Sequence, residues 1–231
     1  MPESISAFGA GSIAELEARG HQGLAPPLPL DDPNAGPSAH ADAVIEAVRQ
    51  LRGPLVVVGQ SLGAFAASLV ADRIEVASIV LVAPMIPAPG ETAGDWWAAV
   101  KHDQVIAPLT RRLGPMGAWG PEEMTEVFLH DVPADIASAA ARFVGAPGPG
   151  MFRERWSLSA WPQVPTRVLA PREDRLFPLE FQRRVTLKRL GLPVEDMPGG
   201  HLPMLARPGE LADWLTSKSA SSDRRSTPQS G

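Results

Sequence analysis

The chain of 231 residues is long enough for one sizeable domain, and its 44% hydrophobic and 20% charged residues are typical of a globular protein. Its net charge of −5 gives no electrostatic basis for binding nucleic acid or an anionic membrane, and the absence of cysteine excludes disulfides, thiol catalysis and cysteine-ligated metals. The first twenty residues lack a signal peptide and no stretch is apolar enough to span a membrane, so we expect a cytoplasmic protein.

The first fifty residues predict two helices and a loop. Ser12 and Glu15 form a capping-box pattern, which predicts a short helix ending at Gly20. A loop rich in proline and glycine follows, with at most a short strand over Gln22–Ala25 at its start. Apolar residues at helical spacing predict a second helix over Ser38–Arg52.

A parallel βαβ unit is predicted next. Leu55–Val58 and Ser78–Ala83 are continuous apolar runs, which are typical of buried strands, and Leu62–Arg73 between them has the composition of a helix. Two such strands joined by a helix indicate a parallel sheet that is covered on both faces.

Residues 84–160 interrupt this alternation and predict an insertion. They contain many proline and glycine turns and four of the six tryptophans. Three helical stretches are predicted within them: Trp96–Lys101, Glu122–Leu129 and Ala134–Phe143. We expect this lid segment to lie over one end of the sheet.

The alternation of strands and helices resumes after the lid segment. Four elements are predicted: strands over Thr166–Ala170 and Val194–Met197, and helices over Pro178–Leu190 and Pro208–Ser217. We therefore expect an α/β fold, a mostly parallel sheet flanked by helices, in which residues 1–83 and 161–217 form the core around the lid over 84–160. The polar residues 218–231 predict a disordered tail.

Residues 59–63 read Gly-Gln-Ser-Leu-Gly, which matches the G-x-S-x-G pattern of a nucleophile elbow. Such a turn holds its serine in a strained conformation, and we expect both glycines to be needed because a Cβ at either would clash. The following helix would point its N-terminus at the serine, and the Leu62 N–H could bind a developing oxyanion. The pattern predicts that Ser61 is a nucleophile; the alternative is an ordinary polar residue at a helix start.

A serine nucleophile needs a base and an acid, and in the α/β-hydrolase arrangement the acid precedes the histidine in the chain. Asp174 follows the third predicted strand and His201 follows the fourth. Both loops lie at the edge of the sheet that carries Ser61, where open α/β sheets build their sites. We predict His201 as the general base and Asp174 as the orienting acid, with Glu173 as the competing carboxylate.

Other residues carry weaker hypotheses. Trp96 and Trp97 are candidates for the wall of an apolar substrate pocket, and the alternative is that they fill the core beneath the lid. No metal site is expected, because the remaining histidines share no metal-ligand spacing. We expect these histidines at the surface or as caps: His21, His40, His102 and His130.

Several segments together resemble the α/β-hydrolase superfamily, in particular the branch of plant methylesterases, hydroxynitrile lyases and bacterial pyrethroid-hydrolase-like esterases. The resemblance covers roughly residues 10–215. It implies a triad of Ser61, Asp174 and His201 with no cofactor. It rests on Ala-Arg-Gly-His (18–21), Gly-Gln-Ser-Leu-Gly (59–63), Val-Ala-Pro-Met-Ile-Pro-Ala-Pro-Gly (82–90), Ala-Trp-Pro-Gln-Val-Pro-Thr (160–166), Glu-Asp-Arg-Leu-Phe-Pro (173–178) and Gly-Gly-His-Leu-Pro (199–203).

The chain departs from this family at its start. Family members begin with strands, the third of which ends in a His-Gly loop that supplies a second oxyanion N–H. We expect those strands to be missing here, with Ser4–Phe8 as a makeshift strand and Phe8–Ala10 as a makeshift donor loop. Ser4–Phe8, Gln22–Ala25 or a second chain would then cover the open edge of the strand Leu55–Val58.

The sequence therefore predicts a serine hydrolase, a carboxylesterase that acts on small to medium apolar esters through an acyl-enzyme. Its expected partner is a small-molecule ester. Two alternatives stay open. One is a lyase or a biosynthetic acyl-transfer or cyclisation enzyme on the same scaffold, for which Lys101 is the available lysine. The other is a catalytically impaired binding protein.

Overall fold

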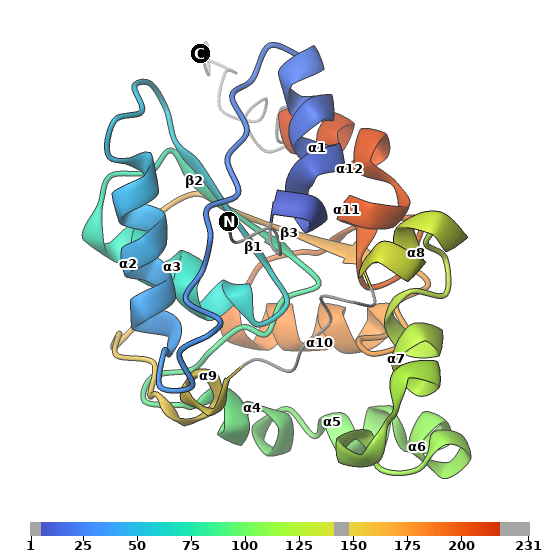
Figure 1. The fold of residues 1–231 in the computed structure, drawn as a ribbon. Helices are drawn as coiled ribbons and strands as arrows, with labels where there is room; N and C mark the ends of the chain where they lie inside the picture. Colours follow the sequence, from blue (N-terminus) through green and yellow to red (C-terminus); the bar gives the residue numbers. More distant parts are fainter. Residues whose placement is uncertain (1–5, 141–147, 218–231) are drawn as a thin grey trace, which may run out of the picture.

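The structure is a computed structural model that describes residues 6–140 and 148–217 (Figure 1). Its described strands form one sheet in the order β1-β2-β3-β4, in which every neighbouring pair is parallel. The strands are β1 (Val56–Gln60), β2 (Ser78–Val82), β3 (Thr166–Pro171) and β4 (Glu195–Met197). Each was predicted to within two residues, and the α/β fold class is confirmed.

Helices cover both faces of this sheet. In Figure 1, α2, α3 and α10 lie on one side of it, and α1, α11 and α12 lie on the other. Helix α3 connects β1 to β2 and α10 connects β3 to β4, as a parallel sheet requires. The bounds are α1 (Ser6–Ala18), α2 (Pro37–Val48), α3 (Gly63–Arg73), α10 (Leu179–Leu190), α11 (Pro203–Ala206) and α12 (Pro208–Thr216).

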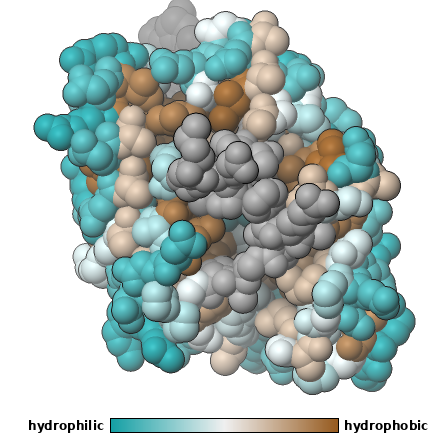
Figure 2. All heavy atoms as spheres, viewed as in Figure 1, coloured by the Kyte–Doolittle hydropathy of each residue, from teal (hydrophilic) through white to brown (hydrophobic). Residues whose placement is uncertain are grey.

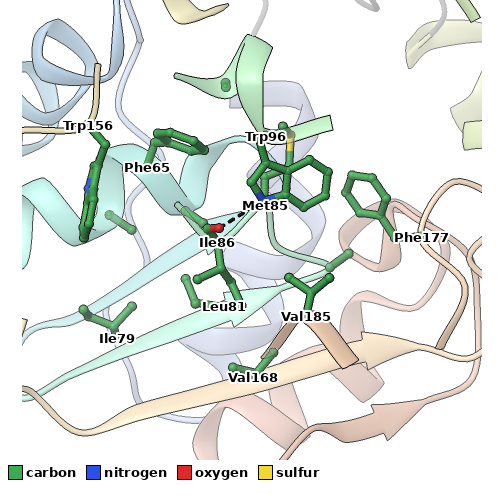
Figure 3. Close-up of a cluster of buried hydrophobic side chains, with 14 of the residues drawn as sticks. Phe65, Ile79, Leu81, Met85, Ile86, Trp96, Trp156, Val168, Phe177 and Val185 are labelled. Carbon is green, nitrogen blue, oxygen red and sulfur yellow. Dashed lines mark hydrogen bonds between the residues drawn. The ribbon is translucent and has the colours of Figure 1, made fainter. Parts of the chain in front are cut away.

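The core has two parts because successive strand side chains point to opposite faces of the sheet. Ile79 and Leu81 of β2 belong to the larger part, which contains side chains of α3 and α10 (Figure 3). Val80 and Leu169 belong to the smaller part, against Leu211 of α12. Burial of each such side chain stabilises the fold by about 1.5–3 kcal/mol, so these contacts fix the helices on the sheet.

Between β2 and β3 the described chain is mainly helical. In Figure 1, α4, α5 and α6 run along one end of the molecule and α7 and α8 rise along its side. The elements are α4 (Ala93–Ala99), α5 (His102–Val105), α6 (Ala107–Leu113), the 3₁₀ turn η1 (Met116–Ala118), α7 (Pro121–Phe128), α8 (Ala134–Ala140) and α9 (Pro149–Arg153). They occupy the predicted lid segment, whose bounds and role stay predictions.

A buried ion pair anchors the start of the lid segment on α10. Arg189 and Glu91 are only 11% and 8% exposed, and the Arg189 Nη2 donates to Glu91 Oε1 at 2.9 Å. The same guanidinium donates through Nη1 to the Ile86 carbonyl at 2.6 Å. Because a buried charge without its partner is costly, this pair holds the chain that leaves β2 in one place.

The N-terminal segment differs from the prediction. Helix α1 begins at Ser6, so Ser12 lies within it, and the part of the predicted strand Ser4–Phe8 that the structure describes is helical. The predicted donor loop Phe8–Ala10 lies in the same helix. Tertiary packing explains the difference, because α1 docks on α11 and α12, where the Ser12 hydroxyl donates to the Met204 carbonyl at 3.4 Å.

The segment Gln22–Ala25 is not a strand, which is a second correction. Pro26 and Pro27 follow it, and proline has no N–H to donate to a strand ladder. Within residues 6–140 and 148–217, no strand pairs with the outer edge of β1. Val56 and Val58 on this strand are accordingly 46% and 47% exposed. Within these residues, neither the Ser4–Phe8 segment nor Gln22–Ala25 pairs with the outer edge of β1 as predicted.

The surface is mostly polar at its margins on the face drawn in Figure 2, with smaller groups of apolar residues between the polar ones. None of the helices in the described ranges combines the length and apolar character of a membrane span. The predicted tail over 218–231 and the end of the predicted helix Ala134–Phe143 lie outside the described residues.

Candidate active site

Ser61 occupies the turn between β1 and α3, with a left-handed backbone φ of +51°. This conformation is uncommon for a residue other than glycine and needs support from its surroundings. Two hydrogen bonds supply that support. The Ser61 N–H donates to the Val82 carbonyl and the Ser61 carbonyl accepts from the Met85 N–H, both at 2.9 Å. The end of β2 therefore holds the strained turn.

The two glycines of the 59–63 motif differ in what surrounds them. A Cβ at Gly59 would lie 2.8 Å from the Ala67 Cβ and 2.9 Å from the Gly63 carbonyl oxygen, so a larger residue does not fit. A Cβ at Gly63 would meet open space. The expectation that both glycines are sterically required is therefore wrong for Gly63, because no atom lies within 4 Å of where its Cβ would be.

Asp174 and His201 form a buried pair on the loops that follow β3 and β4. The His201 Nδ1 lies 2.8 Å from Asp174 Oδ2, and the two residues are 2% and 3% exposed. Asp174 Oδ1 accepts the N–H groups of Leu176 and Phe177, both at 2.9 Å. An ionised carboxylate can only accept, so His201 carries its proton on Nδ1 and leaves Nε2 able to take another.

Two aromatic rings hold the His201 imidazole edge to face. The Phe177 ring centroid lies 5.2 Å from that of His201 at 78°, and the Phe128 centroid lies 5.3 Å away at 80°. Phe177 comes from the loop of the acid and Phe128 from the end of α7 in the lid segment. Such pairs fix the ring plane, so the imidazole keeps one orientation.

Gln60 links the serine turn to the histidine loop. Its side-chain Nε2 donates to the His201 carbonyl at 3.0 Å, which places the His201 backbone beside the residue that precedes Ser61. The Ser61 hydroxyl itself makes no hydrogen bond to any residue in the described ranges. Catalytic hydrogen bonds are often long before a substrate binds, so this geometry does not remove His201 as the base for Ser61.

Glu173, the competing carboxylate, has a different position. Its side chain accepts the Gly199 N–H and its own N–H donates to the Gly199 carbonyl at 3.0 Å. Glu173 therefore holds the backbone of the histidine loop and leaves the imidazole to Asp174.

The predicted oxyanion donor lies at the start of α3. Leu62 is the N-cap residue of this helix, and its N–H donates to no acceptor within the part of the chain that the structure describes. It is thus free to bind a negative oxygen, which the helix dipole also favours. The second donor expected from Phe8–Ala10 is not formed there, because that stretch lies in α1.

The two candidate pocket tryptophans lie in different environments. Trp96 is fully buried in the core and donates through Nε1 to the Ile86 carbonyl at 3.0 Å (Figure 3). Trp97 is partly buried and lines a surface hollow of ≈ 620 Å³ together with Lys101 and His102. Trp96 therefore fills core space, as the alternative interpretation had it, and Trp97 is the one with access to a ligand.

This hollow does not include Ser61, and neither does a second one of ≈ 410 Å³ around Trp161 and Arg189. The second hollow lies beside the residues that lead into β3, far from the serine turn along the strand. Lys101 is exposed at the edge of the first hollow.

His102 is buried next to the acid loop, which corrects its expected place at the surface. It is 1% exposed and its Nε2 lies 2.8 Å from the Leu176 carbonyl, two residues from Asp174. Burial lowers the pKa of His102, and the bond to the Leu176 carbonyl opposes this shift. The sequence gives no signal for this burial, because the neighbours Lys101 and Asp103 are polar.

The other three histidines have mixed positions. His40 is only 5% exposed, which corrects its expected place at the surface. Burial lowers the pKa of His40, and the negative charge of Glu154 opposes this shift. His21 is exposed, as expected, and His130 is partly buried. Within the described ranges, no group of acidic residues and histidines could hold a metal ion.

The fold is shared with several solved hydrolase structures. The pyrethroid hydrolase from Sphingobium faniae JZ-2 has a TM-score of 0.73 at 20% identity, with 91% of each chain covered. Polyneuridine aldehyde esterase has a TM-score of 0.71 at 19% identity, covering 92% of this chain and 94% of its own. An extracellular alpha/beta-hydrolase from a Paenibacillus species has a TM-score of 0.72 at 16% identity, covering 92% and 93%. At these identities the three structures show that the chain has the same fold.

A search of the curated proteins found no significant match. The profile of the alpha/beta hydrolase family, in contrast, matches residues 4–214, which include both loops of the candidate site and the serine turn. Since this match spans most of the 231 residues, the chain belongs to the alpha/beta hydrolase family.

Proposed function

We propose that the protein is a serine hydrolase, a carboxylesterase that uses Ser61, His201 and Asp174 as its triad. The observation that carries the proposal is the buried pair of His201 and Asp174, with 2.8 Å between Nδ1 and Oδ2, on a loop that Gln60 ties to the strained Ser61 turn. A buried imidazole held in one tautomer beside a strained serine is the arrangement that acyl transfer requires.

In the first half of the reaction, His201 Nε2 removes the Ser61 proton as the hydroxyl oxygen attacks the ester carbonyl. Asp174 stabilises the imidazolium that forms, and its two backbone donors hold the carboxylate in place. The free Leu62 N–H binds the oxyanion. Collapse of the tetrahedral intermediate transfers the His201 proton to the departing alcohol and leaves an acyl group on Ser61.

In the second half, water attacks this acyl group while His201 again acts as the base. The proton passes to Ser61 when the carboxylic acid leaves, so the protein returns to its starting state. The net reaction converts one ester and one water into one carboxylic acid and one alcohol, and the proposed steps use no cofactor.

The substrate side of the proposal is an ester with apolar groups. Phe128 and Phe177 flank His201, and Trp97 lies in contact range of Phe177, with 5.9 Å between ring centroids. Phe177 is itself fully buried, so the partly buried Phe128 and Trp97 are the aromatic side chains placed to favour an apolar ligand. Two of the similar structures carry the names hydrolase and esterase, which agrees with this chemistry.

Labelling with a fluorophosphonate tests the nucleophile. We expect one phosphonyl group per chain on wild-type protein, located at Ser61 by peptide mass analysis, and none on Ser61→Ala. Ser68, which is buried in α3, provides the matched control, since Ser68→Ala should still be labelled. Equal labelling of wild type and Ser61→Ala overturns the assignment.

A further inference from the structure

Three side chains from distant parts of the sequence hold the backbone of the loop that carries His201. Glu173 accepts the Gly199 N–H, Gln60 donates to the His201 carbonyl at 3.0 Å, and Asp131 Oδ2 accepts the Gly200 N–H at 2.7 Å. The first two belong to the sheet edge that forms the site. Asp131 comes from the lid segment, just after α7.

The end of α7 contacts both loops of the candidate triad. Phe128 packs edge to face on the His201 ring, three residues before Asp131. On the acid loop, Arg175 donates to the Glu126 carbonyl at 2.8 Å. The segment 126–131 thus binds the acid loop beside Asp174 and the base loop beside His201.

The two glycines before His201 are explained by this contact. A Cβ at Gly200 would lie 2.6 Å from Asp131 Oδ1 and 2.7 Å from His130 Cε1, so a side chain there would displace Asp131 or His130. At Gly199 the backbone φ is +109°, and a Cβ would lie 3.0 Å from Asp131 Oδ2. The Gly-Gly-His stretch therefore has the shape needed to accept the lid residue.

We propose that Asp131 is a positioning residue for His201, through which the lid segment fixes the catalytic base. The proposal rests on the proposed function for its catalytic consequence. Gly200 directly precedes His201 in the chain. An acceptor that fixes the Gly200 N–H therefore also fixes the backbone position from which the His201 side chain extends. A displacement of about 1 Å in a catalytic group costs up to roughly 10²-fold in rate.

The contact between Asp131 and the Gly200 N–H requires a hydrogen-bond acceptor on residue 131 but does not require a negative charge there. Asp131 Oδ1 is buried without a hydrogen-bond partner in the described ranges, so only Oδ2 accepts a hydrogen bond from the loop. An asparagine in this place can present its carbonyl oxygen to the Gly200 N–H. Alanine and leucine cannot.

The test compares Asp131→Ala and Asp131→Asn with wild type and with Asp135→Ala, an identical substitution at an exposed lid position four residues on. We measure kcat and KM with p-nitrophenyl butyrate, the rate of Ser61 phosphonylation, and hydrogen exchange of the peptide that contains Gly200. We expect Asp131→Ala to lower kcat and the phosphonylation rate by about 10- to 100-fold with KM within threefold. Asp131→Asn and Asp135→Ala should stay within threefold of wild type.

Two results overturn the proposal: an Asp131→Ala rate within twofold of wild type, or a loss in Asp131→Asn as large as in Asp131→Ala. If Asp131→Ala does not fold, Asp131→Leu takes its place with the same expectations. If wild type shows no turnover and no labelling that depends on Ser61, the proposed function fails, and exchange alone decides the positioning contact. Faster exchange at Gly200 in Asp131→Ala but not in Asp131→Asn then supports the contact, and equal exchange overturns it.

Discussion

Gln60 and His201 are joined by a hydrogen bond from a side-chain nitrogen to a backbone carbonyl, at 3.0 Å. Gln60 is the last residue of β1 and directly precedes Ser61, whereas His201 follows β4 at the other end of the sheet order. The bond spans the sheet edge and uses neither the serine hydroxyl nor the imidazole. The relative placement of the proposed nucleophile and the proposed base therefore depends on a residue that has no proposed part in proton transfer.

The choice between the two carboxylates of the acid loop can be tested directly. We expect Asp174→Asn to lower kcat by about 10³- to 10⁴-fold, because the amide favours the wrong His201 tautomer. Glu173→Gln should cost far less, since its carbonyl oxygen can still accept the Gly199 N–H. Steady-state kinetics with one activated ester compare the two variants. A silent Asp174→Asn together with an inactive Glu173→Gln would reverse the assignment.

The glycines of the serine turn should respond in opposite ways to alanine. Gly59→Ala places a Cβ against the Ala67 side chain and the Gly63 carbonyl, and overpacking of this kind costs about 1–3 kcal/mol of unfolding free energy. Gly63→Ala meets open space at the start of α3, where alanine gains up to about 1 kcal/mol over glycine. Urea unfolding followed by tryptophan fluorescence measures both. Equal destabilisation would contradict the packing at Gly59.

The neighbouring tryptophans of α4 provide a matched pair. Trp96→Ala removes a fully buried side chain and its bond to the Ile86 carbonyl, so we expect a loss of about 3–5 kcal/mol in unfolding free energy. Trp97→Ala should cost less and should change the ratio of kcat/KM between short and long acyl esters. A uniform fall with every ester, parallel to a fall in melting temperature, would show that Trp97 only fills the core.

Buried His102 makes part of the stability depend on pH. Burial lowers its folded-state pKa below the ordinary 6.5, so the unfolded chain binds the proton first as the pH falls. The contribution of His102 is fully present above pH 6.5 and is lost as the pH falls toward the lowered pKa. His102→Gln, whose amide can still donate to the Leu176 carbonyl, should therefore destabilise the protein less at pH 5 than at pH 8. Denaturant titrations at both values measure this difference, in which His40 cancels because both proteins contain it. A difference that is constant with pH would contradict a buried neutral imidazole.

Much of the sheet could be predicted because its signals are local. Continuous runs such as Ser78–Val82 are buried on both faces, and their apolar character shows in the sequence itself. The places of Asp174 and His201 follow from the same reasoning, because each residue lies on the loop after a predicted strand. Their mutual contact required only that adjacent parallel strands end at one edge.

Contacts that depend on tertiary packing could not be predicted. Asp131 meets Gly200 across 69 positions of the chain, and nothing near Asp131 distinguishes it from an exposed lid residue such as Asp135. Helix α1 begins six residues before its capping-box pattern because α11 and α12 provide a surface for it. In both cases the deciding partner lies far along the sequence.

The chain order of the sheet has a consequence for how the protein folds. Strands β1 and β2 are joined by one helix, as are β3 and β4, but β2 ends at Val82 and β3 begins only at Thr166. Two local halves can form early, whereas closing the long loop between them carries an entropy cost and is slow. Ser61 belongs to the first half, and Asp174 and His201 belong to the second. We therefore expect ester turnover to be the last property regained on refolding, after the secondary structure of both halves has returned.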